Sequence, residues 1–273
     1  MNRIDQTLAR MQASNKKILS PYITAGDPKP ALTVDLMHAL VAAGASILEI
    51  GIPFSDPMAE GPVIQAAMER ALAYHISCDD VFAMIKTFRQ QDSTTPIVLM
   101  GYLNPIEQYG YQRFAKQATA AGVDGTIIVD LPPEESKELA AIWHEAGLYS
   151  IYLCSPTTSS ARMQLIKDYG RGYLYYVSLK GVTGADSFDL TTVKNQYQQR
   201  KTQTNLPLMV GFGIKTAAMA AEVADFADGV IVGAALIEQI LHAYNQQLDP
   251  LAAAAKLINS MRQAMDKNGT HHE

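Results

Sequence analysis

The chain has 273 residues, of which 48% are hydrophobic and 18% are charged, and its formal net charge is −5. This length suits two ordinary domains or one large α/β barrel, and the composition is that of a soluble globular protein with a sizeable core. The mild acidity argues against nucleic-acid binding, and no apolar run approaches the roughly 20 residues of a membrane span.

The first residues, 1–17, contain no apolar core segment and no small-residue cleavage site, so they do not resemble a signal peptide. The two cysteines, Cys78 and Cys154, are far apart and lack the spacing of metal ligands. Two reduced thiols are typical of a cytoplasmic protein, and we expect that location.

Short β-branched or aromatic runs alternate with Ala-rich amphipathic stretches along the chain. Near-continuous apolar runs are typical of parallel strands that are buried on both faces. The predicted strands, in chain order, are residues 18–24, 46–52, 96–102, 125–131, 149–155, 172–179, 206–212 and 229–234. Helices are predicted between them. Local signals mark several helix ends: Gly44 at the end of residues 31–44, a capping box of Ser77 and Asp80, an N-cap at Thr216, and Asp249 before Pro250.

Eight strands, each followed by a helix, are the pattern of a (β/α)8 barrel. An open doubly wound sheet is the alternative, but it usually has fewer strands, and no G-x-G-x-x-G fingerprint is present. No segment has the composition of a linker, so residues 1–273 are predicted to form a single TIM-barrel domain. Extra helices are expected at the N-terminus and after strands 2 and 8. The long connections after strands 2 and 6 place residues 54–65 and 180–189 in loops at the catalytic face.

Glu49 is the most informative residue, because it interrupts the apolar run 46–52. Burying a carboxylate is costly unless the group is paired or used in catalysis. One interpretation is an ion pair at a barrel end. The other is a catalytic acid/base with a raised pKa at the C-terminal end of the second strand, able to give and take a proton near neutral pH.

Three further residues could complete such a site. Glu60 lies on the loop after the same strand, where a second acid allows two separate protonation tasks; a solvated loop charge is the alternative. Asp56 in the same loop is equally consistent with a Ser-Asp-Pro turn. Tyr175 shares one strand face with Tyr173 and Val177, and its phenol could hydrogen-bond the acid of the second strand, although ordinary barrel packing would also explain it.

Glycine-rich segments follow the last three predicted strands, at residues 181–184, 211–213 and 232–234. The last segment leads into a short helical stretch, residues 234–244. Phosphate sites of such barrels commonly use these loops and the N-terminus of a short extra helix, because glycine lets backbone N–H groups approach the anion. We expect a phosphate site here, with tight turns as the alternative.

None of the six histidines ends a predicted strand, which argues against a metal site or His-based catalysis. The residues by themselves therefore predict a barrel enzyme that acts on a phosphorylated small molecule by acid–base chemistry. Glu49 is expected at its centre.

Six segments resemble the tryptophan synthase alpha chain family: residues 21–28, 48–65, 101–106, 130–135, 178–184 and 211–214. They cover the loops of the catalytic face, and the match in length and order spans essentially the whole chain. The resemblance implies a carbon–carbon lyase of tryptophan biosynthesis, which cleaves indole-3-glycerol phosphate to indole and glyceraldehyde 3-phosphate.

The resemblance also implies roles for single residues. Glu49 is expected to serve ring C3 and the glycerol hydroxyl, Glu60 to interact with the indole N–H, and Tyr175 to position Glu49. The indole pocket is expected to be lined by Tyr22, Met100, Tyr102, Ile127, Phe212 and Thr183. The phosphate is expected on backbone N–H groups of Gly184, Gly213, Gly233 and Ala234.

Two positions depart from the family pattern. Glu60 stands where the family more often has aspartate, so we expect retained activity with shifted geometry. Ala234 stands where serine is frequent, which removes one hydroxyl donor to phosphate, worth about 1 kcal/mol.

The family implies a partner as well. A pyridoxal-phosphate-dependent beta subunit is expected to contact Asp56, Asn104 and Pro132 in an alpha2beta2 heterotetramer and to receive indole through a tunnel. No cofactor is expected in this chain itself. The alternatives are a stand-alone lyase and a non-catalytic activator of the beta subunit. The two acids argue against the activator, and the docking loops favour the partnered enzyme.

Overall fold

The structure is a computed structural model that describes residues 1–177, 190–211 and 213–268. All paired strands run parallel, in the spatial order β5-β4-β3-β2-β1-β9-β8-β7-β6. They are β1 (Ile18–Thr24), β2 (Leu48–Gly51), β3 (Ile97–Gly101), β4 (Gly125–Ile128), β5 (Tyr149–Ser150), β6 (Leu153–Cys154), β7 (Leu174–Val177), β8 (Leu208–Gly211) and β9 (Gly229–Val232).

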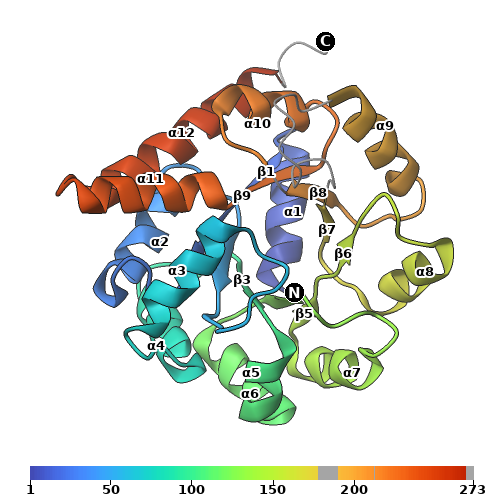
Figure 1. The fold of residues 1–273 in the computed structure, drawn as a ribbon. Coiled ribbons are helices and arrows are strands. Elements are labelled where there is room, and N and C mark those ends of the chain that lie inside the picture. The colour runs from blue at the N-terminus through green and yellow to red at the C-terminus, as the bar shows by residue number, and fades with distance from the viewer. Residues whose placement is uncertain (178–189, 212, 269–273) are drawn as a thin grey trace.

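The short strands β5 and β6 together take the place of the fifth predicted strand. β5 pairs with β4, and β6 pairs with β7. Between them, the N–H of Ile151 donates to the carbonyl of Thr126 (2.9 Å), and the N–H of Tyr175 donates to the carbonyl of Tyr152 (3.0 Å). Residues 149–154 thus bond to both ends of the sheet and close it (Figure 1). The predicted eight-stranded barrel is confirmed, with its fifth strand interrupted rather than continuous.

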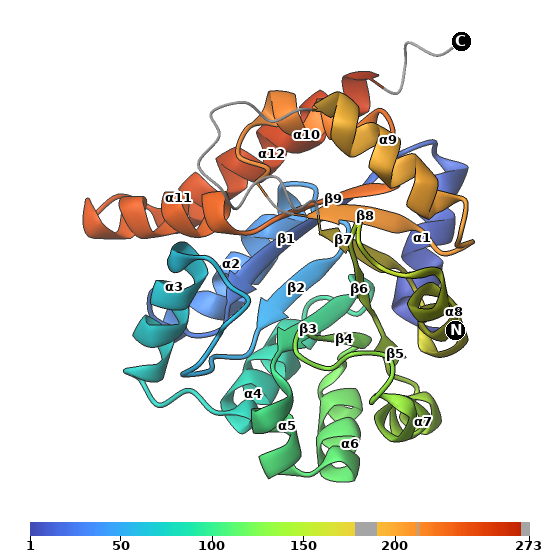
Figure 2. The same ribbon diagram turned by 45° about the vertical axis from the view of Figure 1, so that its right-hand side comes forward.

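The helices surround the barrel (Figures 1 and 2). They are α1 (Arg3–Ala13), α2 (Thr33–Ala42) after the 3-10 turn Pro30–Leu32, α3 (Pro62–Leu72), α4 (Cys78–Arg89), α5 (Leu103–Tyr109), α6 (Tyr111–Ala121), α7 (Lys137–Ala146), α8 (Ser160–Tyr169), α9 (Leu190–Lys201), α10 (Ala217–Ala224), α11 (Ala234–Asn245) and α12 (Pro250–Asn268). The extra helices predicted at the N-terminus and after the second and eighth strands are α1, one of the pair α3 and α4, and one of the pair α11 and α12.

Helix α5 is an additional helix, in a segment that the sequence analysis assigns to a catalytic-face loop. Its Pro105 lies in the first turn, where the missing N–H has no intrahelical acceptor to lose. The N–H of Leu103 at the start of the helix donates to the carboxylate of Asp130 (2.7 Å). A partner from the next βα loop therefore stabilises the start of this helix.

The predicted helix ends are confirmed. Ser77 and Asp80 form a reciprocal capping box, and the side chain of Thr216 accepts a hydrogen bond from the first turn of α10. Asp249 likewise accepts two N–H groups at the start of α12. Gly44 has a φ of +105°, in the left-handed region that suits a residue just after a helix.

Alternation along the strands builds two cores. One set of side chains fills the barrel interior: Ile18, Tyr22, Val98, Met100, Ile127, Tyr173, Met209 and Ile231. The other set packs between strands and helices and includes Leu19, Ile23, Leu48 and Ile50. Ile4 of α1 joins the inner set, so α1 covers the N-terminal end of the barrel. The C-terminal end is left to form the site.

Candidate functional site

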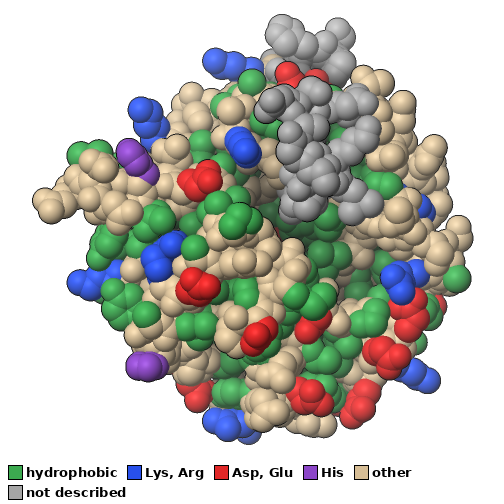
Figure 3. All heavy atoms as spheres, viewed as in Figure 1, with side chains coloured by type: hydrophobic (Ala, Val, Ile, Leu, Met, Phe, Trp, Pro, Cys, Tyr) green, Lys and Arg blue, Asp and Glu red, His purple; other side chains and the backbone are tan. Residues whose placement is uncertain are grey.

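A cavity opens at the C-terminal ends of the strands, and Figure 3 shows a hollow with hydrophobic side chains near the middle of this face. The cavity is bordered by β1, β2, β3, β7 and β9 and by the segments after β2 and β8. The predicted site residues that line it are Tyr22, Glu49, Glu60, Met100, Tyr175, Gly213, Gly233 and Ala234. Barrel closure thus brings both predicted acids and part of the predicted phosphate loops to one cavity.

Glu49 lies on β2 with no exposed surface. Its Oε1 accepts hydrogen bonds from the hydroxyl of Tyr173 (2.7 Å) and from the hydroxyl of Ser20 (3.2 Å). Its Oε2 is buried and has no hydrogen-bond partner among the residues that the structure describes. In the same residues no lysine, arginine or histidine pairs with Glu49, so the ion-pair interpretation finds no support.

Burial raises the pKa of the Glu49 carboxyl to about 7, since the apolar barrel wall disfavours its charged form. The hydrogen bonds from Tyr173 and Ser20 act in the opposite direction, and the nearby charge of Glu60 raises the pKa further. Burial also raises the pKa of Glu60 to about 7. Near neutral pH, each carboxyl can therefore either release or accept a proton.

The hydrogen bond expected between Tyr175 and the acid of the second strand is made by Tyr173. The two tyrosines belong to the same inner core, as predicted, because Tyr173 lies just before β7 and Tyr175 two residues later within it. Tyr173 reaches the Glu49 carboxyl, whereas Tyr175 lines the cavity. The ring of Tyr175 lies over Gly211, where an added Cβ would be 2.2 Å from its hydroxyl oxygen. Only a residue without a side chain leaves room for this ring.

The predicted indole pocket is only partly assembled from described residues. Tyr22 and Met100 line the cavity, and Tyr22 occupies the space over Gly51, where a Cβ would lie 2.1 Å from the tyrosine oxygen. Ile127 is buried in the inner core beside Met100. Tyr102 is buried and does not line the cavity; it holds the loop after β2.

Tyr102 holds that loop through two contacts. Its hydroxyl oxygen accepts a hydrogen bond from the N–H of Ala59 (3.1 Å), and its ring stacks on Phe54 with centroids 5.3 Å apart. Gln65 of α3 donates to the backbone carbonyl of Glu60 (2.8 Å). The loop that carries the second acid is therefore attached at several points.

The part of the cavity where the phosphate is predicted to bind combines a glycine with the start of a helix. Gly233 precedes α11, whose first N–H groups have no intrahelical acceptor, and Ala234 is its first residue. Gly213 has a φ of +77°, which favours glycine. Lys215 and Glu238 also line this end. Lys215 is a lining residue that the glycine pattern does not predict, although it stands two residues after the 211–213 segment. Phe212, Thr183 and Gly184 lie outside the described residues.

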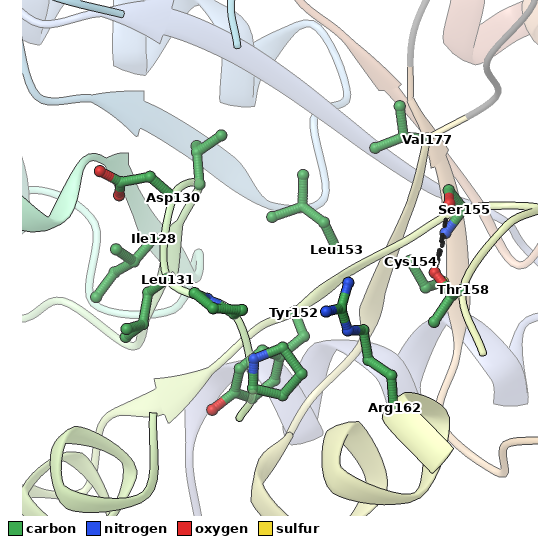
Figure 4. Close-up of a pocket in the computed structure, with 13 residues that line it drawn as sticks. Ile128, Asp130, Leu131, Tyr152, Leu153, Cys154, Ser155, Thr158, Arg162 and Val177 are labelled. Atoms are coloured by element: carbon green, nitrogen blue, oxygen red, sulfur yellow. Dashed lines mark hydrogen bonds between the residues drawn. The ribbon is translucent and has the colours of Figure 1, made fainter. Parts of the chain in front are cut away.

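A second pocket lies at the ends of β4, β6 and β7 (Figure 4). Arg162 extends from α8 toward Leu153 in this pocket, and its Nε donates to Glu134 (2.8 Å). Asp130 is the one acid among its described lining residues, and it accepts the N–H of Leu103. This pocket lacks the pair of acids that marks the first cavity.

The residues expected to contact a partner lie in neighbouring segments that follow strands, Asp56 and Pro132 in loops and Asn104 in the first turn of α5. Asp56 and Asn104 are exposed, and Pro132 is partly exposed and borders the second pocket. Because they follow the adjacent strands β2, β3 and β4, all three lie along one side of the barrel end.

Two features are absent from the described residues. Nowhere among them do three or more His, Cys, Asp or Glu side chains gather in a way that could hold a metal ion. No helix in this part of the chain has the length and apolar character needed to cross a membrane.

The chain is similar to known proteins over almost its whole length. A family model described as tryptophan synthase alpha chain matches residues 8–266. The tryptophan synthase alpha chain of Legionella pneumophila (strain Lens) is 66% identical over 270 residues, covering 99% of both chains. That of Methylococcus capsulatus is 51% identical over 266 residues, covering 97% of this chain and 100% of the relative.

A solved structure agrees with these relatives. The crystal structure of tryptophan synthase subunit alpha from Legionella pneumophila str. Paris has a TM-score of 0.94 to this chain at 64% identity. It covers 98% of this chain and 99% of the other. The chain belongs to the tryptophan synthase alpha chain family, the lyase subunit that cleaves indole-3-glycerol phosphate.

Proposed function

We propose that Glu49 and Glu60 perform the proton transfers of this cleavage. Indole is a poor leaving group as a carbanion, so the ring must first become an electron acceptor. Protonation of ring C3 by Glu49, with removal of the ring N–H proton by Glu60, produces an indolenine tautomer. The observation that carries this proposal is that both carboxyls line one cavity with their pKa raised to about 7.

Cleavage follows from that tautomer. Glu49, now ionised, accepts the proton of the glycerol hydroxyl, and the electrons of the breaking C–C bond move into the indolenine ring. Glu60 then returns a proton to the ring nitrogen. The products are indole and glyceraldehyde 3-phosphate, and each carboxyl ends in its starting state. We assign to Tyr175, which lines the cavity, a role in positioning the ring against Glu49.

We propose that the substrate lies across the cavity, with the phosphate at the start of α11 and the indole toward β1 and β3. Backbone N–H groups of Gly184, Gly213, Gly233 and Ala234 would hold the phosphate, assisted by the helix dipole. Tyr22, Met100, Ile127, Phe212 and Thr183 would enclose the indole, and Tyr102 would act by holding the loop of Glu60.

The alpha chain family implies a beta-subunit partner. We propose an alpha2beta2 heterotetramer in which the loops of Asp56, Asn104 and Pro132 face that subunit and indole passes to it for L-tryptophan synthesis. Pyridoxal phosphate would be bound by the beta subunit. We further propose that residues 1–273 act as a single domain in the cytoplasm.

The test is an indole-release assay on Glu49→Gln, with and without the cognate beta subunit. A glutamine keeps the shape but cannot transfer the proton, so we expect at least about a 100-fold loss of turnover with largely intact binding of a substrate analogue. Glu222→Gln, which changes an exposed acid on α10, serves as the control. Near-normal turnover of Glu49→Gln would overturn the mechanism. A high indole-release rate of the unaltered chain that the beta subunit does not stimulate would indicate a stand-alone lyase.

A further inference from the structure

Ser20 interrupts the apolar run of β1 with a hydroxyl group that has no exposed surface. Ile18 and Tyr22, two residues to either side, belong to the inner core, so Ser20 also points into the barrel. A buried hydroxyl needs a hydrogen-bond partner, and Ser20 finds one in Oε1 of Glu49 (3.2 Å). This contact gives a reason for a polar residue in an otherwise apolar layer.

The two donors to Glu49 act on the same oxygen. Tyr173, just before β7, and Ser20, on β1, approach Oε1 from different parts of the barrel, while Oε2 has no partner among the described residues. Ser20 is absent from the residues that line the cavity, whereas Glu49 lines it. One oxygen of the carboxyl is therefore held by the barrel wall, and the other remains available.

We propose that Ser20 is a positioning residue that, together with Tyr173, fixes Oε1 of Glu49 so that Oε2 is the oxygen that exchanges protons with the substrate. This inference rests on the proposed role of Glu49. Two anchors on one oxygen leave the carboxyl little freedom to rotate, so Oε2 returns to the same place after each transfer.

The contact also predicts a direction for the acidity of Glu49. A hydroxyl that donates to a carboxylate stabilises the charged form, so its loss raises the pKa. The other titratable groups around the carboxyl are Tyr22 on β1, Tyr173 just before β7, Tyr175 on β7, and Glu60 on the loop after β2. The charge of Glu60 and burial already raise the pKa, so removing Ser20 adds to them.

The test compares kcat and KM for indole-3-glycerol phosphate across pH, using the full chain with its beta subunit. For Ser20→Ala we expect kcat to fall about tenfold with little change in KM, because Ser20 does not line the cavity. The limb of the kcat/KM profile that reports Glu49 should move up by about one pH unit. Ser20→Thr, which keeps the hydroxyl, should restore the position of that limb.

Ser46→Ala is the matched control. Ser46 is also a buried serine next to β1, but its hydroxyl oxygen accepts the N–H of Leu19 and does not contact Glu49. We expect it to lower stability without moving the pH profile. If Ser20→Ala does not fold, Ser20→Cys serves in its place. Its thiol is a weak hydrogen-bond donor, so the limb of the kcat/KM profile that reports Glu49 must also move to higher pH.

A profile of Ser20→Ala that superimposes on that of the unaltered chain would overturn the inference, and so would an equal shift in Ser46→Ala. Loss of activity in Glu49→Gln with a normal Ser20→Ala would reject only this inference. Normal turnover of Glu49→Gln would instead reject the proposed function on which it rests.

Discussion

Glu49 and Glu60 have similar acidity but different surroundings. Glu49 is enclosed in the barrel wall and held by two hydroxyl donors, whereas Glu60 lies on a loop that is attached through its backbone carbonyl to Gln65. A carboxyl fixed in the wall suits repeated transfers at one place. The Glu60 side chain is one methylene longer than the aspartate that is more frequent in the family, which extends the reach of its carboxyl from the attached loop.

The first prediction concerns the length of that acid. Glu60→Asp should retain most of the indole-release rate, because the carboxyl is kept and only one methylene is lost. Glu60→Gln should lose about 100-fold or more in kcat, since an amide cannot accept the ring N–H proton. Steady-state assays of indole release by both variants test this prediction. Equal activity of Glu60→Gln and the unaltered chain would remove Glu60 from the mechanism.

The second prediction concerns pH and stability. Burial raises the pKa of Glu49 from 4.5 to about 7 in the folded chain, so the folded state binds the proton more tightly than the unfolded state. The free energy of unfolding should therefore fall as pH rises from about 4.5 to about 7, by up to about 3 kcal/mol from this residue. Glu49→Gln should show a smaller fall.

Urea unfolding at pH 5 and pH 8 measures the difference between the two chains. Glu49→Gln should gain stability relative to the unaltered chain at pH 8 and differ little at pH 5. An equal pH dependence of both chains would show that Glu49 does not carry this cost.

At the level of elements, Asp124 links four of them at the N-terminal end of the barrel. Its carboxylate, 3% exposed, accepts hydrogen bonds from Arg3 of α1 (2.9 Å) and from Arg89 of α4 (3.0 Å). It also accepts the N–H of Ile97 in β3 (2.9 Å) while standing just before β4. Burial lowers the pKa of Arg89 to about 10, which leaves it charged and paired at neutral pH.

The third prediction follows from this pairing. Asp124→Ala leaves the largely buried Arg89 with backbone carbonyls but without its carboxylate partner, so we expect a loss of about 3–5 kcal/mol in the free energy of unfolding. Asp79→Ala is the control, because the exposed carboxylate of Asp79 pairs with Arg113 and accepts a hydrogen bond from Tyr109 at the surface and should contribute no more than about 1 kcal/mol. Denaturant titration of both variants tests this, and similar losses would contradict it.

Elements differ in how well their sequence predicts them. The capping box of Ser77 and Asp80 acts within one turn, so the local sequence pattern was sufficient to predict the start of α4. Helix α5 depends on Asp130, which lies 27 residues after the N–H that it accepts, and the break between β5 and β6 depends on pairing with both β4 and β7. Contacts so far apart in the chain leave no local signal.

For the whole molecule, the ends of β2, β3 and β4 form the side that we assign to the partner. Met58 lies on the first of these loops, beside Asp56, and is 82% exposed. An exposed large apolar side chain on a loop that carries a candidate catalytic acid is suited to be covered when a partner binds.

The fourth prediction is that Met58→Ser weakens binding of the beta subunit by about fivefold or more. A buried apolar anchor contributes at least about 1 kcal/mol to an interface. The indole-release rate of the isolated chain should be unchanged. Leu248→Ser, which removes a side chain 63% exposed between α11 and α12, is the control and should bind normally. Calorimetry with the cognate beta subunit tests both, and normal binding by Met58→Ser would place the interface elsewhere.

The sequence by itself was enough to predict the barrel, several helix ends and the presence of Glu49 and Glu60 at one site. Strand runs, helix caps and a carboxylate inside an apolar run are local features, so each can be recognised from a few neighbouring residues. The cost of burying a carboxylate can likewise be inferred from its apolar neighbours. The tertiary structure decided which groups meet. Ser20 lies on β1, Glu49 on β2 and Tyr173 just before β7, and only closure of the barrel brings two hydroxyls to one oxygen. The choice of Tyr173 over Tyr175 depends on depth inside the barrel, which alternation along a single strand cannot specify.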